Sequence, residues 1–285
     1  MRSAIPRAYR CRAHAHAPFN SLSGRVVVTA RDLAPSFRSM IAMDDVNRFV
    51  VGILGGMGSY STLHFFQQIV DAFDVDKEWE RPRIVIDNHC ILPSRTRAIL
   101  YGERRDQLVA GMAQSIEGLL RYDPHVVCMP CNTAHCFLPE VRARLGGRDD
   151  RVLDMIELVA SACEARGTSR AFLLATEGTI ATGVYDDYFG RRGMEVVSAD
   201  EAQQRAVRAY IEQVKQKRGL DPAGFSAFID GLGLSPVILG CTELSVLYDG
   251  CSRAEALDPL AMMVGRIRQL SDDLNAAACS PHPSR

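Results

Sequence analysis

Two short segments of this chain each lead from a β-branched, apolar strand into a cysteine that is followed by polar residues. The first segment, residues 126–133, contains Cys131, and the second, residues 237–243, contains Cys241. In α/β proteins the groups that bind ligands lie beyond the carboxyl ends of parallel strands. The sequence therefore predicts two similar halves, each presenting one thiol to a shared cleft.

From residue 48 onward, apolar segments alternate with segments of helical periodicity. Continuous apolar strands separated by helices are typical of parallel sheets that helices cover on both faces. We predict strands over residues 49–54, 83–87, 125–129, 170–175, 195–198 and 237–239. We predict helices over residues 62–73, 104–121, 134–145, 179–189, 201–217 and 258–274.

This order predicts an α/β fold with two pseudo-symmetric domains, each a parallel-type sheet flanked by helices, and an active site in the cleft between them. The first domain is expected to span residues 47–148 and the second residues 149–256. The last helix, residues 257–276, is expected to pack back on the first domain, and residues 277–285 are expected to form a disordered tail.

The N-terminal residues 1–46 differ in composition from the rest of the chain. The first 45 residues hold seven arginines and only three acids, and they show no clear periodicity. This composition is typical of organelle transit peptides. It fits better a disordered or non-native extension ahead of Met43, the natural start just before the first strand.

The charge balance favours a small molecule as the ligand. The chain has 285 residues and a formal net charge of −1, which gives no reason to expect a nucleic acid or a membrane surface as a partner. No stretch approaches the roughly 18 apolar residues that a transmembrane helix needs. Nine cysteines, an odd number without the spacing of a disulfide framework, predict reduced thiols and a cytoplasmic protein.

Lysine is nearly absent from the sequence. Lys77, Lys215 and Lys217 are the only lysines, against thirty arginines. None of the three follows a strand or lies in a glycine-rich motif. This distribution argues against a lysine that forms a pyridoxal Schiff base.

A glycine-rich turn, residues 52–59, joins the first predicted strand to the first predicted helix. Its glycine spacing departs from the dinucleotide fingerprint, and Asp74, about 20 residues on, lies on a helix rather than at a strand end. Glycines at a helix N-terminus let backbone N–H groups approach an anion. The turn therefore predicts a site for a small carboxylate or a phosphate, with tight packing as the structural alternative.

The cysteine-rich segment at the first of the two strand ends allows three interpretations. Cys128 and Cys131 have the spacing of a redox pair. His135 and Cys136 could complete a zinc site with them. Because the segment lies in an apolar strand and no second ligand cluster follows, we expect Cys128 and Cys136 to be buried apolar residues. Cys131 and Cys241 differ, since a thiol at the start of the following helix is expected to have a lowered pKa.

Polar residues after two further strands are candidates for substrate binding. Arg95 follows the second strand and could hold a carboxylate in a bidentate fork, or pair with an acid of a neighbouring helix. Thr176 and Thr179 follow the first strand of the second half, where their hydroxyl groups could bind a carboxylate or cap the next helix. The sequence leaves these alternatives open.

These segments together resemble the aspartate/glutamate racemase family, the cofactor-independent amino-acid racemases. The matching pieces are residues 52–58 with Thr62, 88–100, 130–135, 175–185 and 240–244. The resemblance implies two pseudo-symmetric α/β domains, a homodimer, an amino-acid substrate, and neither a cofactor nor a metal. It implies an isomerase that acts on aspartate or glutamate.

The resemblance also assigns roles to individual residues. Cys131 and Cys241 are implied to be the catalytic bases, one on each face of the substrate's α-carbon, and Arg95 is implied to bind a distal carboxylate. The implied substrate-binding residues are Met57, Gly58, Asn88, Arg95, Asn132, Thr133, Thr176, Thr179 and Thr242, with Glu243 and His135 in supporting roles.

Racemisation places a physical demand on such a site. The α-proton of an amino acid is too weakly acidic for a thiolate with a pKa of about 8.5 to remove it in water. Hydrogen bonds aimed at the carboxylate, in a cleft without water, have to stabilise the carbanion. One cysteine has to start as the thiolate and the other as the thiol, and the two exchange states in each turnover.

Several positions depart from the family's pattern. Ser59 and Ser61 stand where the family usually has Pro and Ala, and Ser94 stands where it has Asp. No lysine follows Thr179 to assist Arg95. These departures leave a hydantoin racemase open, as well as the decarboxylases and maleate-type isomerases of the same fold. A thiol redox protein, a metal-binding protein and a non-catalytic carboxylate-binding protein are alternatives from other classes.

Overall fold

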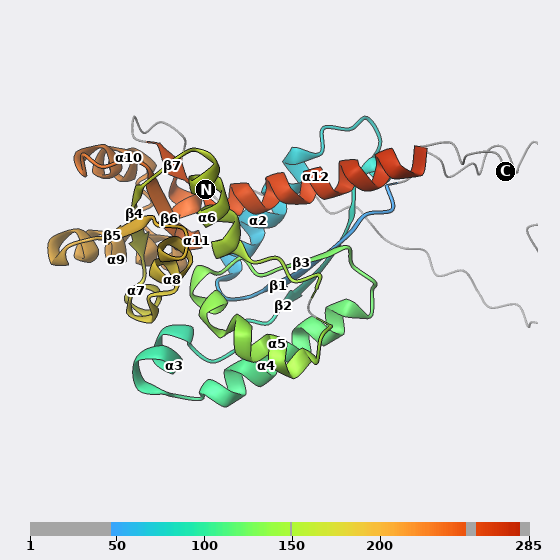
Figure 1. Ribbon diagram of the computed structural model, residues 1–285, viewed down its shortest axis with the longest axis horizontal. Coiled ribbons are helices and arrows are strands. Elements are labelled where there is room, and N and C mark those ends of the chain that lie inside the picture. The colour runs from blue at the N-terminus through green and yellow to red at the C-terminus, as the bar shows by residue number, and fades with distance from the viewer. Residues whose placement is uncertain (1–46, 149, 249–254, 280–285) are drawn as a thin grey trace, which may run out of the picture. The chain divides into compact units, whose positions relative to one another are not determined.

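The computed structural model describes residues 47–148, 150–248 and 255–279. Its helices and strands all belong to one compact unit and form two parallel sheets with helices on both faces (Figure 1). The predicted α/β class is confirmed, whereas the division into two domains remains a prediction. The N-terminal extension lies outside the described residues, and the last helix continues to Cys279, into the predicted tail. Among the described helices, none has the length and apolar character needed to cross a membrane.

The first sheet has the strand order β2-β1-β3, with β1 (Val50–Gly55) between β2 (Arg83–Asn88) and β3 (Val126–Cys128). Five of the six residues of β1 are buried, which is why its sequence is continuously apolar rather than alternating. β2 lies at the edge, and its residues are partly or fully exposed. All three strands run parallel, so their carboxyl ends meet at one edge of the sheet.

The second sheet repeats this arrangement in the order β5-β4-β6-β7. β4 (Arg170–Ala175) again lies between the next two strands of its half, β5 (Glu195–Ser198) and β6 (Val237–Gly240). The short strand β7 (Ala256–Leu257), which the sequence pattern does not predict, extends the sheet beyond β6. The repeated order places β3 and β6, the strands that precede Cys131 and Cys241, in equivalent positions.

Helices from both ends of the chain cover the first sheet. α2 (Ser59–Ala72) and α12 (Pro259–Cys279) pack together on one face, and α4 (Arg105–Leu120) and α5 (Leu138–Leu145) cover the other (Figure 1). The last helix of the chain thus completes the core of the first sheet. The buried side chains that α2 and α12 share with the sheet include Val51, Ile53, Phe65, Ile69, Leu260 and Met263.

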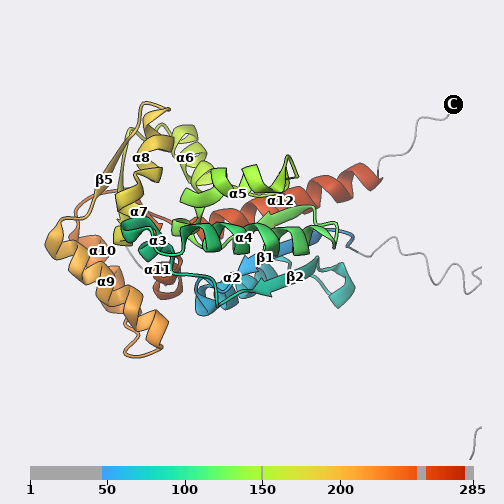
Figure 2. The same cartoon turned by 90° about the horizontal axis from the view of Figure 1, so that it is seen from below.

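The second sheet is likewise covered on both faces. α6 (Met155–Ala165) and α8 (Val184–Gly190) lie on one side, and α9 (Glu201–Gln216) and α10 (Pro222–Gly231) lie on the other (Figure 2). On α9 the buried residues recur every three or four positions, as in any amphipathic helix that packs on a sheet. These buried residues are Val207, Ile211 and Val214.

Two predicted helices differ in form from the structure. The helix predicted over residues 179–189 is divided into α7 (Glu177–Thr182) and α8, because Gly183 adopts a φ of 61° and ends the first of them. The helix predicted from residue 134 begins instead as a 3₁₀-helix, η3 (Asn132–Phe137). The sequence pattern also misses short or less periodic helices, namely η2 (Glu78–Glu80), α3 (Arg95–Tyr101), α6, α10 and α11 (Thr242–Leu247).

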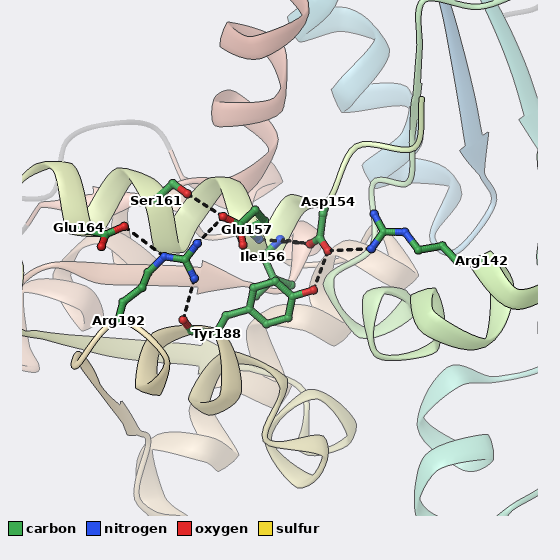
Figure 3. A network of polar contacts seen from close by, with 8 residues as sticks. All are labelled: Arg142, Asp154, Ile156, Glu157, Ser161, Glu164, Tyr188 and Arg192. Atoms are coloured by element: carbon green, nitrogen blue, oxygen red, sulfur yellow. Dashed lines mark hydrogen bonds and ion pairs between the residues drawn. The ribbon is translucent and has the colours of Figure 1, made fainter. Parts of the chain in front are cut away.

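Asp154 lies where the chain passes from the first sheet to the second. Its carboxylate caps α6 by accepting hydrogen bonds from the backbone N–H groups of Ile156 and Glu157, at 3.1 and 3.2 Å. It also accepts a hydrogen bond from the hydroxyl group of Tyr188 on α8, and it lies 3.9 Å from the guanidinium group of Arg142 on α5 (Figure 3). One side chain therefore ties a helix of the first sheet to two helices of the second.

The glycine-rich turn after β1 depends on Gly56. This residue has a φ of 81°, and a Cβ atom at its position would lie 2.5 Å from the backbone atoms of His89 and Cys90. We expect Gly56→Ala to lower the free energy of unfolding by about 3 kcal/mol, because a left-handed backbone and a backbone clash both oppose the methyl group. Chemical denaturation of the purified variant measures the change.

Gly102→Ala is the matched control for this substitution. Gly102 also has a positive φ, 68°, but apart from its chain neighbours no atom of the described residues lies within 4 Å of a Cβ added there. We expect this variant to lose only about 1 kcal/mol, since the backbone cost remains and the clash is absent. Equal losses in the two variants would contradict the role of close packing at Gly56.

Candidate active site

The two cysteines occupy equivalent positions in the two halves. Cys131 follows β3 and is the N-cap residue of η3, and Cys241 follows β6 and is the N-cap residue of α11. Both have an extended backbone, and both carbonyl groups accept a hydrogen bond from the N–H group three residues further on, at 3.1 and 2.9 Å. Each cysteine is 6% exposed. The same local fold thus presents one nearly buried thiol from each half.

Both thiols line one cavity of about 90 Å³. This volume suits a small molecule and not a nucleotide, which argues against a dinucleotide at the glycine-rich turn. Most of the predicted site residues meet here. Besides the two cysteines, the lining residues are Met57, Ser94, Arg95, Thr96, Asn132, Thr133, Thr176, Lys215, Thr242 and Glu243.

Three hydroxyl groups from the two halves form a hydrogen-bonded cluster at this cavity. The hydroxyl oxygen of Thr133 lies 3.2 Å from that of Thr176 and 2.8 Å from that of Thr179, and the latter two are 3.1 Å apart. Thr176 also caps α7 by accepting a hydrogen bond from the backbone N–H of Thr179 at 3.2 Å. Helix capping, one of the two alternatives that the sequence leaves open, is therefore confirmed for Thr176. Thr176 also lines the cavity, and carboxylate binding by its hydroxyl group stays a prediction.

The predicted lowering of the Cys131 pKa is wrong. Burial raises the pKa of this thiol, and the nearby guanidinium group of Arg95 opposes only part of the rise. The short 3₁₀-helix that follows the cysteine does not offset the loss of water around the thiolate. Arg95 itself donates hydrogen bonds to the carbonyl oxygens of Met57 and Pro93, at 2.8 and 3.3 Å. It is therefore held at the cavity, where its charge favours the thiolate form of Cys131.

Cys241 has an acidic neighbour instead. Its thiol donates a hydrogen bond to the carboxylate of Glu243, with 3.0 Å between sulfur and oxygen. Burial raises the pKa of Cys241 well above its ordinary value, and the negative charge of Glu243 raises it further. Gly58 makes room for this carboxylate, because a Cβ atom at Gly58 would lie 2.7 Å from Oε1 of Glu243. The predicted lowering of the Cys241 pKa is therefore also wrong, because burial raises it.

Lys215 is a lining residue that the sequence pattern does not reveal. α9 carries it to the cavity wall, and its ammonium group lies 3.2 Å from the carboxylate of Glu212. Burial lowers the pKa of Lys215, but the charges of Glu243, Cys241 and Glu212 raise it by more, so the side chain stays cationic. No lysine stands at the motif that contains Thr179, but α9 brings Lys215 to the cavity that Arg95 also lines.

Four predicted site residues lie outside the cavity lining. Asn88 is exposed at the end of β2, where its amide donates a hydrogen bond to the hydroxyl group of Ser59 at 3.1 Å. His135 contacts the backbone of the first cysteine, because its Nδ1 donates a hydrogen bond to the carbonyl oxygen of Cys131 at 2.9 Å. The other two, Gly58 and Thr179, contact residues that do line the cavity.

A model of the Asp/Glu/Hydantoin racemase family matches residues 54–267 of the chain. The chain belongs to this family. Its structure is similar to that of the Picrophilus torridus aspartate racemase, with a TM-score of 0.69 and 24% identity, covering 79% of this chain and 94% of that one. The glutamate racemase of Francisella tularensis, solved with D-glutamate, has a TM-score of 0.54 and 16% identity, covering 84% of this chain and 86% of that one.

The chain is also similar in sequence to a known amino-acid racemase. The broad specificity amino-acid racemase RacX of Bacillus subtilis is 25% identical over 211 residues, which are 70% of this chain and 88% of RacX. Membership of the family confirms the resemblance seen in the sequence and makes the chain an isomerase of the racemase type. The likeness to the two solved racemases extends to the α/β fold.

Two further cysteines lie close to the cavity of Cys131 and Cys241 but do not line it. Cys128 is fully buried on β3, and burial raises its pKa, as expected of a thiol that packs as an apolar side chain. The thiol of Cys136 donates a hydrogen bond to the carbonyl oxygen of Thr133 at 3.0 Å, and burial raises its pKa to about 12. Six cysteines are free, namely Cys90, Cys128, Cys131, Cys136, Cys163 and Cys241. Within the described residues, no three His, Cys, Asp or Glu side chains are grouped to bind a metal.

A larger hollow of about 350 Å³ lies between α2, α9 and α11. Its walls are mainly apolar, and no cysteine lines it. Cys131 and Cys241 both line the smaller cavity instead. The residues that line the larger hollow are Tyr60, Leu63, His64, Gln67, Val214, Lys217, Leu220 and Val246.

Proposed function

We propose that this protein is an amino-acid racemase that works without pyridoxal phosphate and acts on aspartate or glutamate through a pair of cysteines. The observation that carries the proposal is that Cys131 and Cys241 line one small cavity from equivalent positions of the two halves. Racemisation needs a group that removes the α-proton from one face and a group that returns a proton to the other. Two thiols from different walls of the cavity meet this need.

The charges of the cavity favour a substrate with two carboxylates. Arg95 and Lys215 both line it, and among the described residues no aspartate or glutamate forms an ion pair with Arg95. Guanidinium and ammonium groups bind carboxylates through charge-assisted hydrogen bonds. We assign both cations to the side-chain carboxylate of the substrate. A neutral hydantoin or an apolar amino acid would leave them without this partner.

Three further donors of the cavity are assigned to the α-carboxylate. They are the amide group of Asn132 and the hydroxyl groups of Thr133 and Thr176. Negative charge grows on this carboxylate as the α-proton leaves, because the electron pair of the broken C–H bond delocalises into it. Donors that are already in place stabilise that charge without reorganisation, which is where the site reduces the barrier.

Each turnover moves one proton off the α-carbon and another onto it. The thiolate of one cysteine takes the α-proton, and the thiol of the other donates its proton to the opposite face. Nothing is oxidised or reduced, and the two cysteines exchange protonation states. Arg95 favours the thiolate of Cys131, whereas Cys241 donates its hydrogen to Glu243. We therefore expect the free enzyme to hold Cys131 as the base and Cys241 as the acid.

The rate of racemisation is expected to increase as the pH rises above neutrality. Activity needs one thiolate, and burial raises the pKa of both Cys131 and Cys241, so the thiolate becomes abundant only in alkaline solution. Glu243→Gln removes a negative charge that raises both pKa values, so the rising limb of its profile should move to lower pH. Profiles of kcat/KM against pH for the two proteins check this prediction. A wild-type rate that falls from neutral into alkaline solution would contradict it.

The proposed activity is tested by incubating the purified protein, without added cofactor, with each enantiomer of aspartate and of glutamate. Chiral chromatography should show the opposite enantiomer appearing until the two are equal, since enantiomers have the same free energy. Racemisation of a hydantoin alone, release of carbon dioxide, or conversion of maleate to fumarate would replace the proposal with a related reaction of the same fold.

The proposal extends to a homodimer in a reducing compartment such as the cytoplasm. Catalysis by a thiolate needs both cysteines in the reduced form, and Cys131 and Cys241 are both free. Light scattering of the purified protein measures the assembly. A mass equal to that of one chain at all concentrations would contradict the homodimer.

A further inference from the structure

Tyr185 belongs to the second half of the chain, and its hydroxyl group contacts a lining residue of the first half. It lies on α8, is 1% exposed, and donates a hydrogen bond to Oδ1 of Asn132 over 2.6 Å. Asn132 directly follows Cys131 and lines the cavity. A buried hydrogen bond therefore connects the second half to the residue beside the first thiol.

The amide nitrogen of Asn132 is free for a ligand. The side chain is 1% exposed, and its Nδ2 atom has no hydrogen-bond partner among the described residues. A buried N–H group without an acceptor is destabilising, so native proteins rarely leave one in that state unless a ligand or water supplies the acceptor. A carboxylate bound in the cavity would supply it.

The hydroxyl group of Tyr185 sets which end of the Asn132 amide can contact a ligand. Burial raises the pKa of the phenol well above its ordinary value, so the group keeps its hydrogen and needs an acceptor. Oδ1 of Asn132 is that acceptor. Rotating the amide by half a turn would direct N–H groups at the hydroxyl group and would turn the carbonyl oxygen to a bound carboxylate. The phenolic hydrogen would then lose Oδ1 as its acceptor, and the carbonyl oxygen would face another acceptor, the carboxylate.

We propose that Tyr185 is a positioning residue of the racemase, which holds the amide of Asn132 with its N–H groups towards the α-carboxylate of the substrate. This inference rests on the proposed function. The donor is then in place before negative charge develops on that carboxylate. Because Tyr185 and Asn132 come from different halves, the donor is correctly oriented only when the two halves are in contact.

Tyr185→Phe tests the inference, since it removes the hydroxyl group and keeps the ring. We expect kcat to fall roughly 10- to 100-fold while KM changes far less, because the oriented N–H group contributes most in the transition state. Tyr188→Phe is the matched control. Tyr188 lies on the same helix, and its hydroxyl group donates to Asp154 at 2.7 Å (Figure 3). Neither residue lines the cavity. We expect this control to keep the wild-type kcat.

Wild-type kcat in Tyr185→Phe, or equal losses in both variants, would overturn the inference. A measurement that does not depend on enzymatic activity tests the inference separately from the proposed function. The side-chain amide resonances of Asn132, assigned in labelled protein by comparison with Asn132→Ala, should shift and broaden in Tyr185→Phe and stay unchanged in Tyr188→Phe. Unchanged resonances in Tyr185→Phe would also overturn the inference. A wild-type protein that racemises neither aspartate nor glutamate would contradict the proposed function, and shifted resonances would still support the orientation of the amide.

Discussion

Replacing Cys131 or Cys241 by serine is expected to lower kcat for racemisation roughly 1,000-fold or more in both directions. A serine hydroxyl group is a far weaker acid than a thiol, so it neither forms the anion that removes the α-proton nor donates a proton as readily. With one of the two groups gone, the carbanion is reprotonated mainly from the face on which it formed, which returns the starting enantiomer. Initial rates from each enantiomer, measured by chiral chromatography, give the size of the loss.

Cys90→Ser is the matched control for the two serine variants. Cys90 is exposed, follows β2 and does not line the cavity, so this variant should keep the wild-type kcat. Denaturation midpoints of all three variants distinguish a loss of chemistry from a loss of folding. Racemisation at the wild-type rate by either Cys131→Ser or Cys241→Ser would contradict the two-thiol mechanism.

Lys215→Met is expected to lower kcat/KM for aspartate and glutamate roughly 100- to 1,000-fold, because it leaves the side-chain carboxylate of the substrate with one cation instead of two. The substitution also removes a positive charge that lowers the pKa of Cys241, an effect that slows every substrate. The quantity to compare is therefore the loss of kcat/KM for substrates with a side-chain carboxylate and for substrates without one. Asparagine and glutamine, which have no side-chain carboxylate, should show a much smaller change.

Lys217→Met is the control for charge and helix position. Lys217 lies two residues further on, and its ammonium group sits 5.3 Å from the ring centroid of Tyr60, outside the cavity lining. We expect its kcat/KM values to match those of the wild type. Equal losses for charged and neutral substrates in Lys215→Met would contradict the assignment of Lys215 to the side-chain carboxylate.

The sequence predicts well the structural features that depend only on residues adjacent in the chain. The strand bounds agree within one residue, because buried parallel strands need continuous apolar runs and the turns after them need polar or small residues. Cys131 and Cys241 are recognisable for the same reason, since each directly follows such a strand. The parallel order of the strands then brings both thiols to the edges where ligands bind.

The features that the sequence does not predict depend on how distant elements pack. Lys215 lies on a helix whose inward face is set by packing on the sheet, and it stands near no motif. Tyr185 ends the matching piece 175–185, but its contact with Asn132 depends on how the two halves pack. The pKa of Cys131 was expected to fall because a helix begins beside it, but burial has the larger effect. Such burial is a property of the assembled site and not of the local sequence.

The most direct test of the central claim, that two thiols act on opposite faces of one α-carbon, is the position of deuterium early in the reaction in deuterium oxide. With a separate base and acid, each newly formed enantiomer carries solvent deuterium at the α-carbon, while the remaining substrate keeps its proton. We expect this distribution from either enantiomer of the active substrate, as measured by proton NMR after chiral separation. Deuterium that enters substrate and product equally from the start, or product that retains the substrate's proton, would contradict the claim.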